Sequence, residues 1–366
     1  MFGKKGKDGM DEERVRALVG ALQDPVDGKK LSERLQRVEL GRSIQLDMTL
    51  PTPAWGSRFQ LEEQIRKALQ GEGATRDIQV RFGFDVQRAR PQGSAQSLVP
   101  GAKNVVLFAS GKGGVGKSTV ATNVAAAFAK LGASVGLLDS DIYGPSIPTM
   151  LGVNAKPEVV GQKLMPIERY GMKLMSIGFI VDPHQAMSWR GPMLNGALTQ
   201  FMRDVEWGEL DYLFLDLPPG TGDVQLTIAQ NLKVSGAVLV STPQDVALAD
   251  VIRGKAMFDR VDVPILGVVE NMAYFVCPNC SERHSIFSSG GAGRIADELK
   301  LPLLAEIPFE IETRQSADVG EPEVLAHPES SAAQAFVELS LRIGTELAKS
   351  AARQSMKAGV GLKIIQ

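Results

Sequence analysis

A glycine-rich loop at residues 111–119 constrains the fold of this chain more than any other feature. Its sequence, Gly-Lys-Gly-Gly-Val-Gly-Lys-Ser-Thr, contains the phosphate-binding pattern G-x-x-x-x-G-K-[ST]. The apolar run 105–109 precedes the loop as a buried strand should, and the alanine-rich segment 119–131 follows it with helical composition. Strand, loop and helix in this order predict a P-loop, in which backbone amides and a helix N-terminus bind the phosphates of a nucleoside triphosphate.

The loop side chains have distinct expected roles. Lys117 is expected to reach the outer phosphates, and the Ser118 hydroxyl to bind Mg²⁺. The other loop residues expected to contact the nucleotide are Gly111, Lys112, Gly113, Gly114, Val115, Gly116 and Thr119.

Short apolar strands alternate with helices from residue 104 onward. Strands are predicted at 104–109, 135–139, 172–177, 211–216, 236–241, 265–270 and 303–307, and helices at 119–131, 191–206, 222–232, 245–260, 291–299 and 331–349. This alternation is typical of an α/β fold with a mostly parallel sheet covered by helices on both faces. Ligands of such sheets bind at the carboxyl ends of the strands, where the 111–119 loop lies.

The predicted domain organisation places a small α+β unit at residues 1–87, where two helical and two alternating strand patterns recur. A linker rich in Pro, Gly and Ser follows at 88–103. The P-loop domain is expected at 104–350, and a tail at 351–366.

Composition excludes several classes of protein. The net charge of −2 does not favour nucleic acid or an anionic membrane as a partner. No apolar stretch reaches the length of a membrane span, and the charged N-terminus lacks the apolar core of a signal peptide. We therefore expect a cytoplasmic protein with no nucleic-acid or membrane partner.

Three aspartates follow predicted strands. Asp139 and Asp141 end one strand and Asp216 ends another, so all three are expected near the P-loop as Mg²⁺-binding or water-positioning groups. Helix capping is an alternative role for Asp139. The loop 218–223, Pro-Pro-Gly-Thr-Gly-Asp, is expected to rearrange when the γ-phosphate leaves.

A second lysine, Lys112, lies in the loop although one lysine suffices to bind the phosphates. The loop resembles the deviant Walker A loop of the superfamily that contains septum-placing, plasmid-partition and arsenite-pump ATPases. This resemblance implies that Lys112 reaches the nucleotide of a partner subunit and that Asp141 positions water. It also implies that Asn271 contacts the base, with Ile307-Pro308-Phe309 beside it. An exposed Lys112 without such a role is the alternative.

The chain has two cysteines, Cys277 and Cys280, so a disulfide framework is excluded. A C-x-x-C pair has three interpretations: a redox dithiol, half of a metal site, or thiols without function. Zinc and iron–sulfur sites normally need four ligands, and His284 still leaves the set within one chain incomplete. Two subunits about a two-fold axis would supply four thiolates.

Four segments together resemble the Mrp/Nbp35-type iron–sulfur cluster carrier ATPases: 139–146, 189–193, 215–223 and 277–280. The resemblance implies a [4Fe–4S] cluster bridged by Cys277 and Cys280 of both subunits. Residues 11–85 resemble the MIP18 (DUF59) domain, but Thr-Pro-Ala-Trp-Gly-Ser at 52–57 replaces that domain's cysteine. We therefore expect no metal function there.

These features together predict a homodimeric ATPase with slow hydrolysis that carries an iron–sulfur cluster from assembly scaffold proteins to apoproteins. The residues expected to act in hydrolysis are Lys112, Lys117 and Asp141. One alternative is a partition- or septum-positioning ATPase acting on DNA or membrane. The other is a zinc-stapled dimeric ATPase that inserts a different metal.

Overall fold

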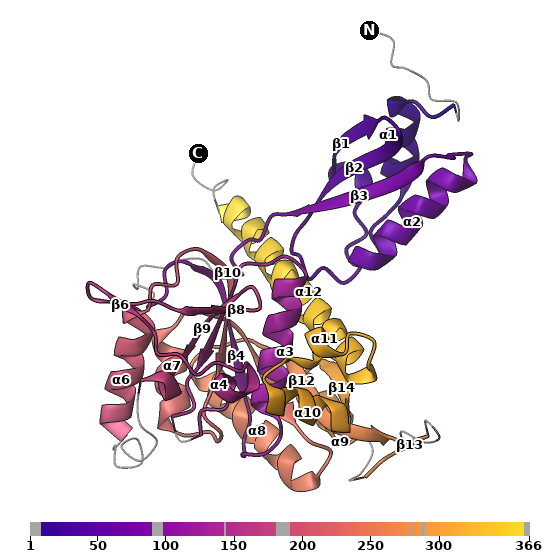
Figure 1. The fold of residues 1–366 in the computed structure, drawn as a ribbon. Helices are drawn as coiled ribbons and strands as arrows, with labels where there is room; N and C mark the ends of the chain where they lie inside the picture. The colour runs from indigo at the N-terminus through magenta and orange to yellow at the C-terminus, as the bar shows by residue number, and fades with distance from the viewer. Residues whose placement is uncertain are drawn as a thin grey trace. The chain divides into compact units, whose positions relative to one another are not determined.

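The computed structural model describes residues 9–89, 98–142, 144–180, 191–277, 280, 282–286 and 290–361. The chain divides into two compact units, residues 1–87 and 88–366 (Figure 1). Within the predicted linker 88–103, residues 90–97 lie outside the described residues, as do Trp189 and Arg190. The first strand of the second unit begins at Ala102, two residues before its predicted start at residue 104.

The N-terminal unit is a three-stranded sheet with two helices. Its elements are α1 (Glu12–Ala21), a short 3₁₀ turn (Leu31–Glu33), β1 (Leu35–Leu40), β2 (Ser43–Leu50), α2 (Arg58–Gly71) and β3 (Asp77–Phe84). Strand β2 is central, antiparallel to β1 and parallel to β3. Alternate residues of β2 are buried, since side chains of a strand point to opposite faces and helices cover one of them.

The second unit is built on a mostly parallel sheet. Its parallel strands are β4 (Ala102–Ala109), β5 (Val135–Asp139), β9 (Met172–Ser176), β10 (Leu210–Asp216), β11 (Val234–Ser241), β12 (Ile265–Val276) and β14 (Leu303–Phe309). Their order across the sheet is β14-β12-β11-β4-β10-β5-β9. Short antiparallel strands, β8 (Ile167–Arg169) and β13 (Arg283–His284), pair with β9 and β12, and β6 (Val159–Val160) pairs with β7 (Lys163–Leu164). The predicted α/β fold class is confirmed.

Helices cover the sheet in two groups. The first contains α3 (Lys117–Lys130), α4 (Ile147–Met150), α10 (Ile311–Val319), α11 (Glu323–Ala326) and α12 (Ser331–Gly361). The second contains α6 (Gly191–Asp204), α7 (Asp223–Asn231), α8 (Asp245–Arg260) and α9 (Gly291–Leu299). Right-handed crossovers put α3 on the face opposite α6, α7 and α8, because the chain moves across the sheet in one direction as far as β9 and in the opposite direction after it. Helix α3 packs on α11 and α12, and α7 packs between α6 and α8.

Two elements extend further than predicted. Helix α12 continues through residues 351–361, so this part of the predicted tail is helical. Strand β12 continues past Asn271 to Val276, because Met272 adopts a left-handed backbone conformation (φ 57°) that forms an irregularity and lets pairing with β14 resume. None of the helices in the described residues is both long and apolar enough to cross a bilayer.

Candidate functional site

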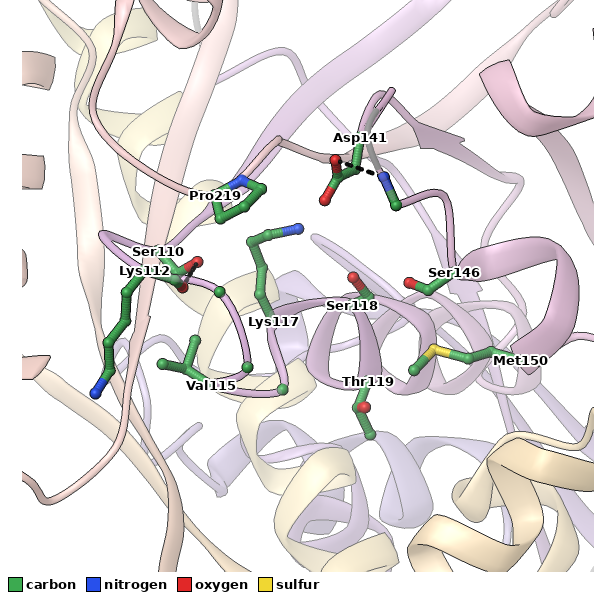
Figure 2. Close-up of a pocket in the computed structure, with 14 residues that line it drawn as sticks. Ser110, Lys112, Val115, Lys117, Ser118, Thr119, Asp141, Ser146, Met150 and Pro219 are labelled. Carbon is green, nitrogen blue, oxygen red and sulfur yellow. Dashed lines mark hydrogen bonds between the residues drawn. The ribbon is translucent and has the colours of Figure 1, made fainter. Parts of the chain in front are cut away.

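The glycine-rich loop joins the end of β4 to the start of α3 and surrounds a cavity of about 230 Å³ (Figure 2). Gly116 is required there on two grounds. Its φ is 77°, and a Cβ at this position would lie 2.1 Å from the Asn271 Nδ2 atom. The residues lining the cavity are Ser110, Lys112, Gly113, Gly114, Val115, Gly116, Lys117, Ser118, Thr119, Asp141, Gly144, Ser146, Met150 and Pro219.

Asp216 forms the buried centre of the site at the end of β10. Its Oδ1 atom accepts a short ion-paired hydrogen bond from Lys117 Nζ, and its Oδ2 atom accepts from Ser118 Oγ at 2.5 Å. Burial raises the pKa of the Asp216 carboxyl, and the positive charge of Lys117 opposes this rise. The arrangement brings together a carboxylate and a hydroxyl, which are oxygen donors of the kind that Mg²⁺ prefers.

Asp139 is fully buried at the end of β5 and holds the following segment in place. Its carboxylate accepts from the backbone N–H groups of Asp141 (3.1 Å) and Ile147 (3.2 Å) and from Ser176 Oγ (3.1 Å). Burial and the neighbouring Asp216 raise the pKa of Asp139 to about 7. Ile147 is the first residue of α4, so one of these bonds fixes the start of that helix, although its N-cap residue is Ser146.

Asp141 lines the cavity, where Figure 2 shows its carboxylate on the side of Lys117 and Ser118. Its Oδ1 atom accepts from the backbone N–H of Gly144 at 3.3 Å, which tightens the loop before α4. Asp141 therefore faces the space that the phosphates are expected to occupy.

Lys112 contrasts with Lys117. Its Nζ atom donates to Gln244 Oε1 at 3.1 Å, and Figure 2 shows its side chain directed away from Asp141 and Ser118. In this structure the Lys112 ammonium group does not face the phosphate cavity of its own chain.

A second cavity of about 320 Å³ adjoins the first and shares Thr119 and Met150 with it. Asn271 and Ile307 lie at paired positions of the neighbouring strands β12 and β14, which brings the two predicted base-contacting segments together. The Asn271 Nδ2 atom donates to the Val115 carbonyl at 2.9 Å. The residues lining this cavity are Thr119, Met150, Asn271, Met272, Ile307, Pro308, Phe309, Glu310, Thr313, Arg314, Ala317, Asp318 and Phe336.

The loop after Asp216 lies against the P-loop. Gly220 donates its backbone N–H to the Ser110 carbonyl at 2.8 Å, and Gln225 Nε2 donates to the carbonyls of Pro218 and Pro219, each at 3.0 Å. Pro219 itself lines the phosphate cavity. This segment therefore contacts the site where it was expected to respond to the γ-phosphate.

The sequence did not reveal several lining residues. Met150 ends the four-residue helix α4 and Ser146 is its N-cap, and this helix is too short to produce a periodic pattern. Thr313 and Arg314 come from α10, far along the chain. The only available signal was the segment 139–146, whose resemblance to the carriers marked it as functional without placing its side chains.

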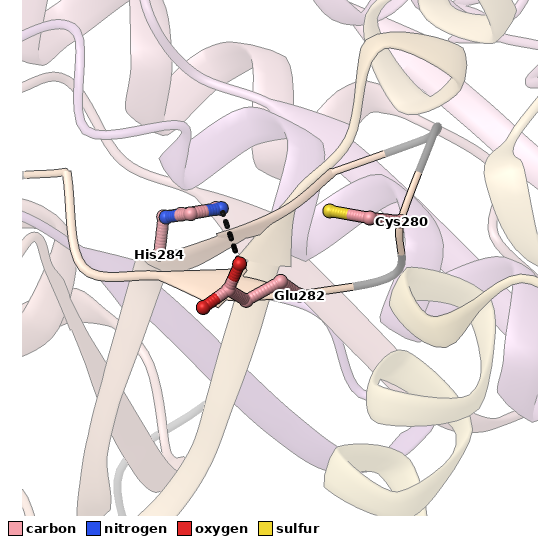
Figure 3. Close-up of side chains that lie close together, drawn as sticks. All are labelled: Cys280, Glu282 and His284. Atoms are coloured by element: carbon pink, nitrogen blue, oxygen red, sulfur yellow. Dashed lines mark ion pairs between the residues drawn. The ribbon is translucent and has the colours of Figure 1, made fainter.

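The cysteine pair lies on a hairpin between β12 and β13. Cys277 directly follows β12, is half-buried, and donates its backbone N–H to the Glu282 carbonyl at 3.0 Å. Cys280 is exposed. The intervening Pro278 and Asn279 lie outside the described residues. Figure 3 shows the Cys280 side chain on the same side of the hairpin as Glu282 and His284.

Trp55 lies in the segment 52–57 and is buried in the N-terminal unit. Its buried indole Nε1 donates to Asp24 Oδ2 at 2.7 Å, and Ser57 Oγ donates to Asp24 Oδ1 at 2.7 Å. Arg34 completes the cluster through an ion pair of 3.0 Å with Asp24. The contacts described here satisfy Asp24 within the unit.

Two solved structures share the fold of the second unit. The nucleotide-binding protein from Archaeoglobus fulgidus, in complex with ADP, is 41% identical with a TM-score of 0.56, covering 64% of this chain and 92% of that chain. The cell division ATPase MinD from Pyrococcus furiosus is 25% identical with a TM-score of 0.51, covering 66% and 98%.

Sequence relatives are more specific. The iron-sulfur cluster carrier protein of Deinococcus radiodurans is 47% identical over 332 residues, which are 89% of this chain and 93% of that protein. The iron-sulfur protein required for NADH dehydrogenase, mitochondrial, of Arabidopsis thaliana is 51% identical over 66% of this chain and 78% of that protein. A family model described as ParA: NUBPL iron-transfer P-loop NTPase matches residues 101–343. The resemblance to the carriers is confirmed, whereas the MIP18-like assignment stays a prediction. The chain belongs to the NUBPL iron-transfer P-loop NTPase family.

Proposed function

We propose that this protein binds and slowly hydrolyses ATP, carries an iron–sulfur cluster between two copies of the chain, and transfers it to apoproteins. The observation that carries the proposal is the hairpin that presents Cys277 and Cys280, with Cys280 exposed. One chain supplies two thiolates, and a [4Fe–4S] cluster takes four. A two-fold axis beside the hairpin would supply the other two. The relatives that are 41–51% identical are named for iron–sulfur proteins, which supports this cargo.

The nucleotide part of the proposal follows from the P-loop cavity. Lys117 and the backbone of residues 111–118 bind the phosphates, while Ser118, Asp139 and Asp216 hold Mg²⁺. When bound by these residues, Mg²⁺ would supply positive charge that offsets the charge developing during phosphoryl transfer. Asp141 orients the attacking water. Because Lys117 is ion-paired with Asp216 in this structure, it must exchange that partner for the phosphates when the nucleotide binds.

The base is proposed to occupy the second cavity. Asn271 and the strand end Ile307–Phe309 line it, and its apolar walls suit an aromatic ring. Thr119 and Met150 border both cavities, so one nucleotide can extend from the first into the second.

Lys112 is proposed to act on the nucleotide of the partner subunit. Its ammonium group bonds to Gln244 rather than facing its own phosphate cavity. A cation supplied by a partner stabilises phosphoryl-transfer charge only after two subunits close. Hydrolysis is therefore slow in the single protomer, and turnover accompanies the loading or transfer of the cluster.

The proposal is tested by metal analysis of anaerobically purified protein. We expect iron and acid-labile sulfide in equal amounts, with one cluster for each pair of protomers. The double variant Cys277→Ser/Cys280→Ser loses iron and sulfide and keeps ATP binding. The control variant Ser285→Ala, on the same hairpin, keeps iron and sulfide. Zinc without sulfide would support the zinc-stapled alternative. Absence of metal together with tight DNA or liposome binding would support the positioning ATPase.

A further inference from the structure

A cluster of three different metal-ligating side chains lies on the cysteine hairpin. Cys280, Glu282 and His284 each offer one ligand atom, and these atoms all lie within 4.8 Å of one another (Figure 3). The Glu282 Oε2 and His284 Nε2 atoms are 3.9 Å apart. Glu282 and His284 are alternate residues beside and within β13, so they share a face of the extended chain, and Cys280 lies in the turn that precedes them. All three are exposed, so an ion can reach them from solvent.

The chemistry of this set suits a single transition-metal ion. Thiolate, carboxylate and imidazole bind Zn²⁺ at about 2.0–2.3 Å, which places neighbouring ligand atoms roughly 3.5 Å apart in a tetrahedron. The present separations need small side-chain rotations to reach that geometry. Three protein ligands leave a fourth position open to water, as in sites that exchange what they bind.

We propose that each protomer has its own site for one divalent transition-metal ion of borderline softness, Zn²⁺ or Fe²⁺, formed by Cys280, Glu282 and His284. The inference rests on the proposed function, because Cys280 is also a ligand of the shared cluster. A protomer whose site is filled has no free Cys280 thiolate to offer its partner. The ion and the bridging cluster therefore exclude each other at this sulfur atom, and release of the ion precedes assembly of the shared site.

The chain contains a matched comparison. His327 lies beside Glu323, with Nδ1 and Oε2 3.3 Å apart, and its side chain is 52% exposed against 51% for His284. Among the described residues, the cluster of possible metal ligands contains His284 together with a thiol. The pair of His327 and Glu323 lies outside that cluster. The Glu323 carboxylate is buried, so His327→Ala controls for adventitious binding at an equally exposed histidine.

The test is titration of the full-length, metal-free protein with Co²⁺ under anaerobic conditions and without sulfide. Co²⁺ reports thiolate ligation through its charge-transfer absorption, and its visible bands report tetrahedral geometry. We expect one Co²⁺ per protomer. Glu282→Gln and His284→Ala each weaken binding by about 10- to 100-fold or more, the loss seen when even a supporting group is removed from a metal site. Zn²⁺ and Fe²⁺ then compete for the bound Co²⁺, and their relative affinities identify the ion the site prefers.

The cysteine variants separate this site from the shared one. Cys280→Ser abolishes the charge-transfer absorption, and Cys277→Ser and His327→Ala retain it. The proposal is overturned if the wild-type protein binds no Co²⁺ or binds one ion per two protomers. It is also overturned if Cys277→Ser loses the charge-transfer absorption as Cys280→Ser does. A third contradicting result is Co²⁺ affinity like that of wild type in Glu282→Gln and His284→Ala. The iron and sulfide content of the reconstituted His284→Ala variant tests the proposed carrier function independently of the Co²⁺ site. Failure of the carrier proposal can therefore be distinguished from failure of the proposal for the single-ion site.

Discussion

At the scale of single residues, the two lysines of the P-loop have different surroundings. Lys117 is 6% exposed and ion-paired with Asp216, while Lys112 bonds to Gln244 away from the phosphate cavity. We therefore expect the two side chains to act on different steps, although both belong to one nine-residue loop.

Replacement of each lysine by alanine tests this difference. Lys117→Ala removes a charged hydrogen-bond donor to phosphate, worth about 1.5–3 kcal/mol, so ATP affinity should fall by about 10- to 100-fold. Lys112→Ala should leave affinity unchanged and lower turnover by about 10-fold or more, as loss of a cation supplied in trans does. Isothermal titration and steady-state hydrolysis measure the two effects, with Lys156→Ala as an exposed control. Equal loss of affinity in both variants would contradict the trans role of Lys112.

Asp139 makes a pH-dependent contribution to stability. Its pKa is about 7 in the folded chain against an ordinary value of 3.8, so the folded state binds this proton more tightly than the unfolded state. The stabilising contribution is full below the ordinary value and is lost as pH rises through about 7. Asp139→Asn cannot lose a proton, so its free energy of unfolding should fall less than that of wild type between pH about 5 and about 8. Urea unfolding at several pH values measures this, and identical pH profiles would refute it.

Sequence reasoning identified the loop side chains, because their chemistry is encoded in a contiguous pattern. The resemblance to the ATPase superfamily also predicted Asn271 as a site residue. Its hydrogen bond to Val115 joins residues that are 156 positions apart in the sequence. No local pattern could reveal Gln244 as the partner of Lys112, since that contact depends on where β11 ends beside β4.

At the scale of elements, the turn between β4 and α3 depends on the left-handed conformation of Gly116. We expect Gly116→Ala to lower the free energy of unfolding by about 1–3 kcal/mol, from the backbone strain and the collision with Asn271. Gly113→Ala is the matched control, because nothing lies within 4 Å of a Cβ built there, and its cost should stay within about 0.5 kcal/mol. Chemical unfolding without nucleotide compares the two variants. A similar cost for both would show that the conformation at Gly116 carries no special constraint.

Elements with a clear apolar pattern were predicted well, and short or irregular ones were not. Helices α8 and α9 match their predicted ranges. The apolar positions of α8 repeat over several turns, and those of α9 lie between clear breaks in the sequence. The sequence predicts that this strand ends at residue 270, because the polar Asn271 interrupts the apolar run. Only the tertiary pairing with β14 shows that β12 continues. Strand β13 has two residues and depends on pairing with β12, so no pattern in the sequence marks it.

At the scale of the whole molecule, the chain consists of two units with separate cores. The residues that line the nucleotide cavities and form the cysteine hairpin all belong to the second unit. A chain that begins at residue 88 should therefore bind ATP with unchanged affinity and keep one cluster per two protomers. Titration calorimetry and iron analysis of this truncated chain provide the check. Loss of ATP binding from soluble, folded protein would show that residues 1–87 take part in the nucleotide site.

Strand β12 connects the proposed nucleotide site with the cysteine hairpin. Asn271 bonds the strand to the P-loop carbonyl of Val115, and Cys277 follows six residues later, immediately after the strand ends. The backbone between them is interrupted once, at Met272, where the pairing with β14 shifts register. If the loop moves at Val115 when nucleotide binds, strand β12 is the shortest covalent path from the strand's contact with the loop to the proposed metal-binding sulfur, and that path lies within one unit.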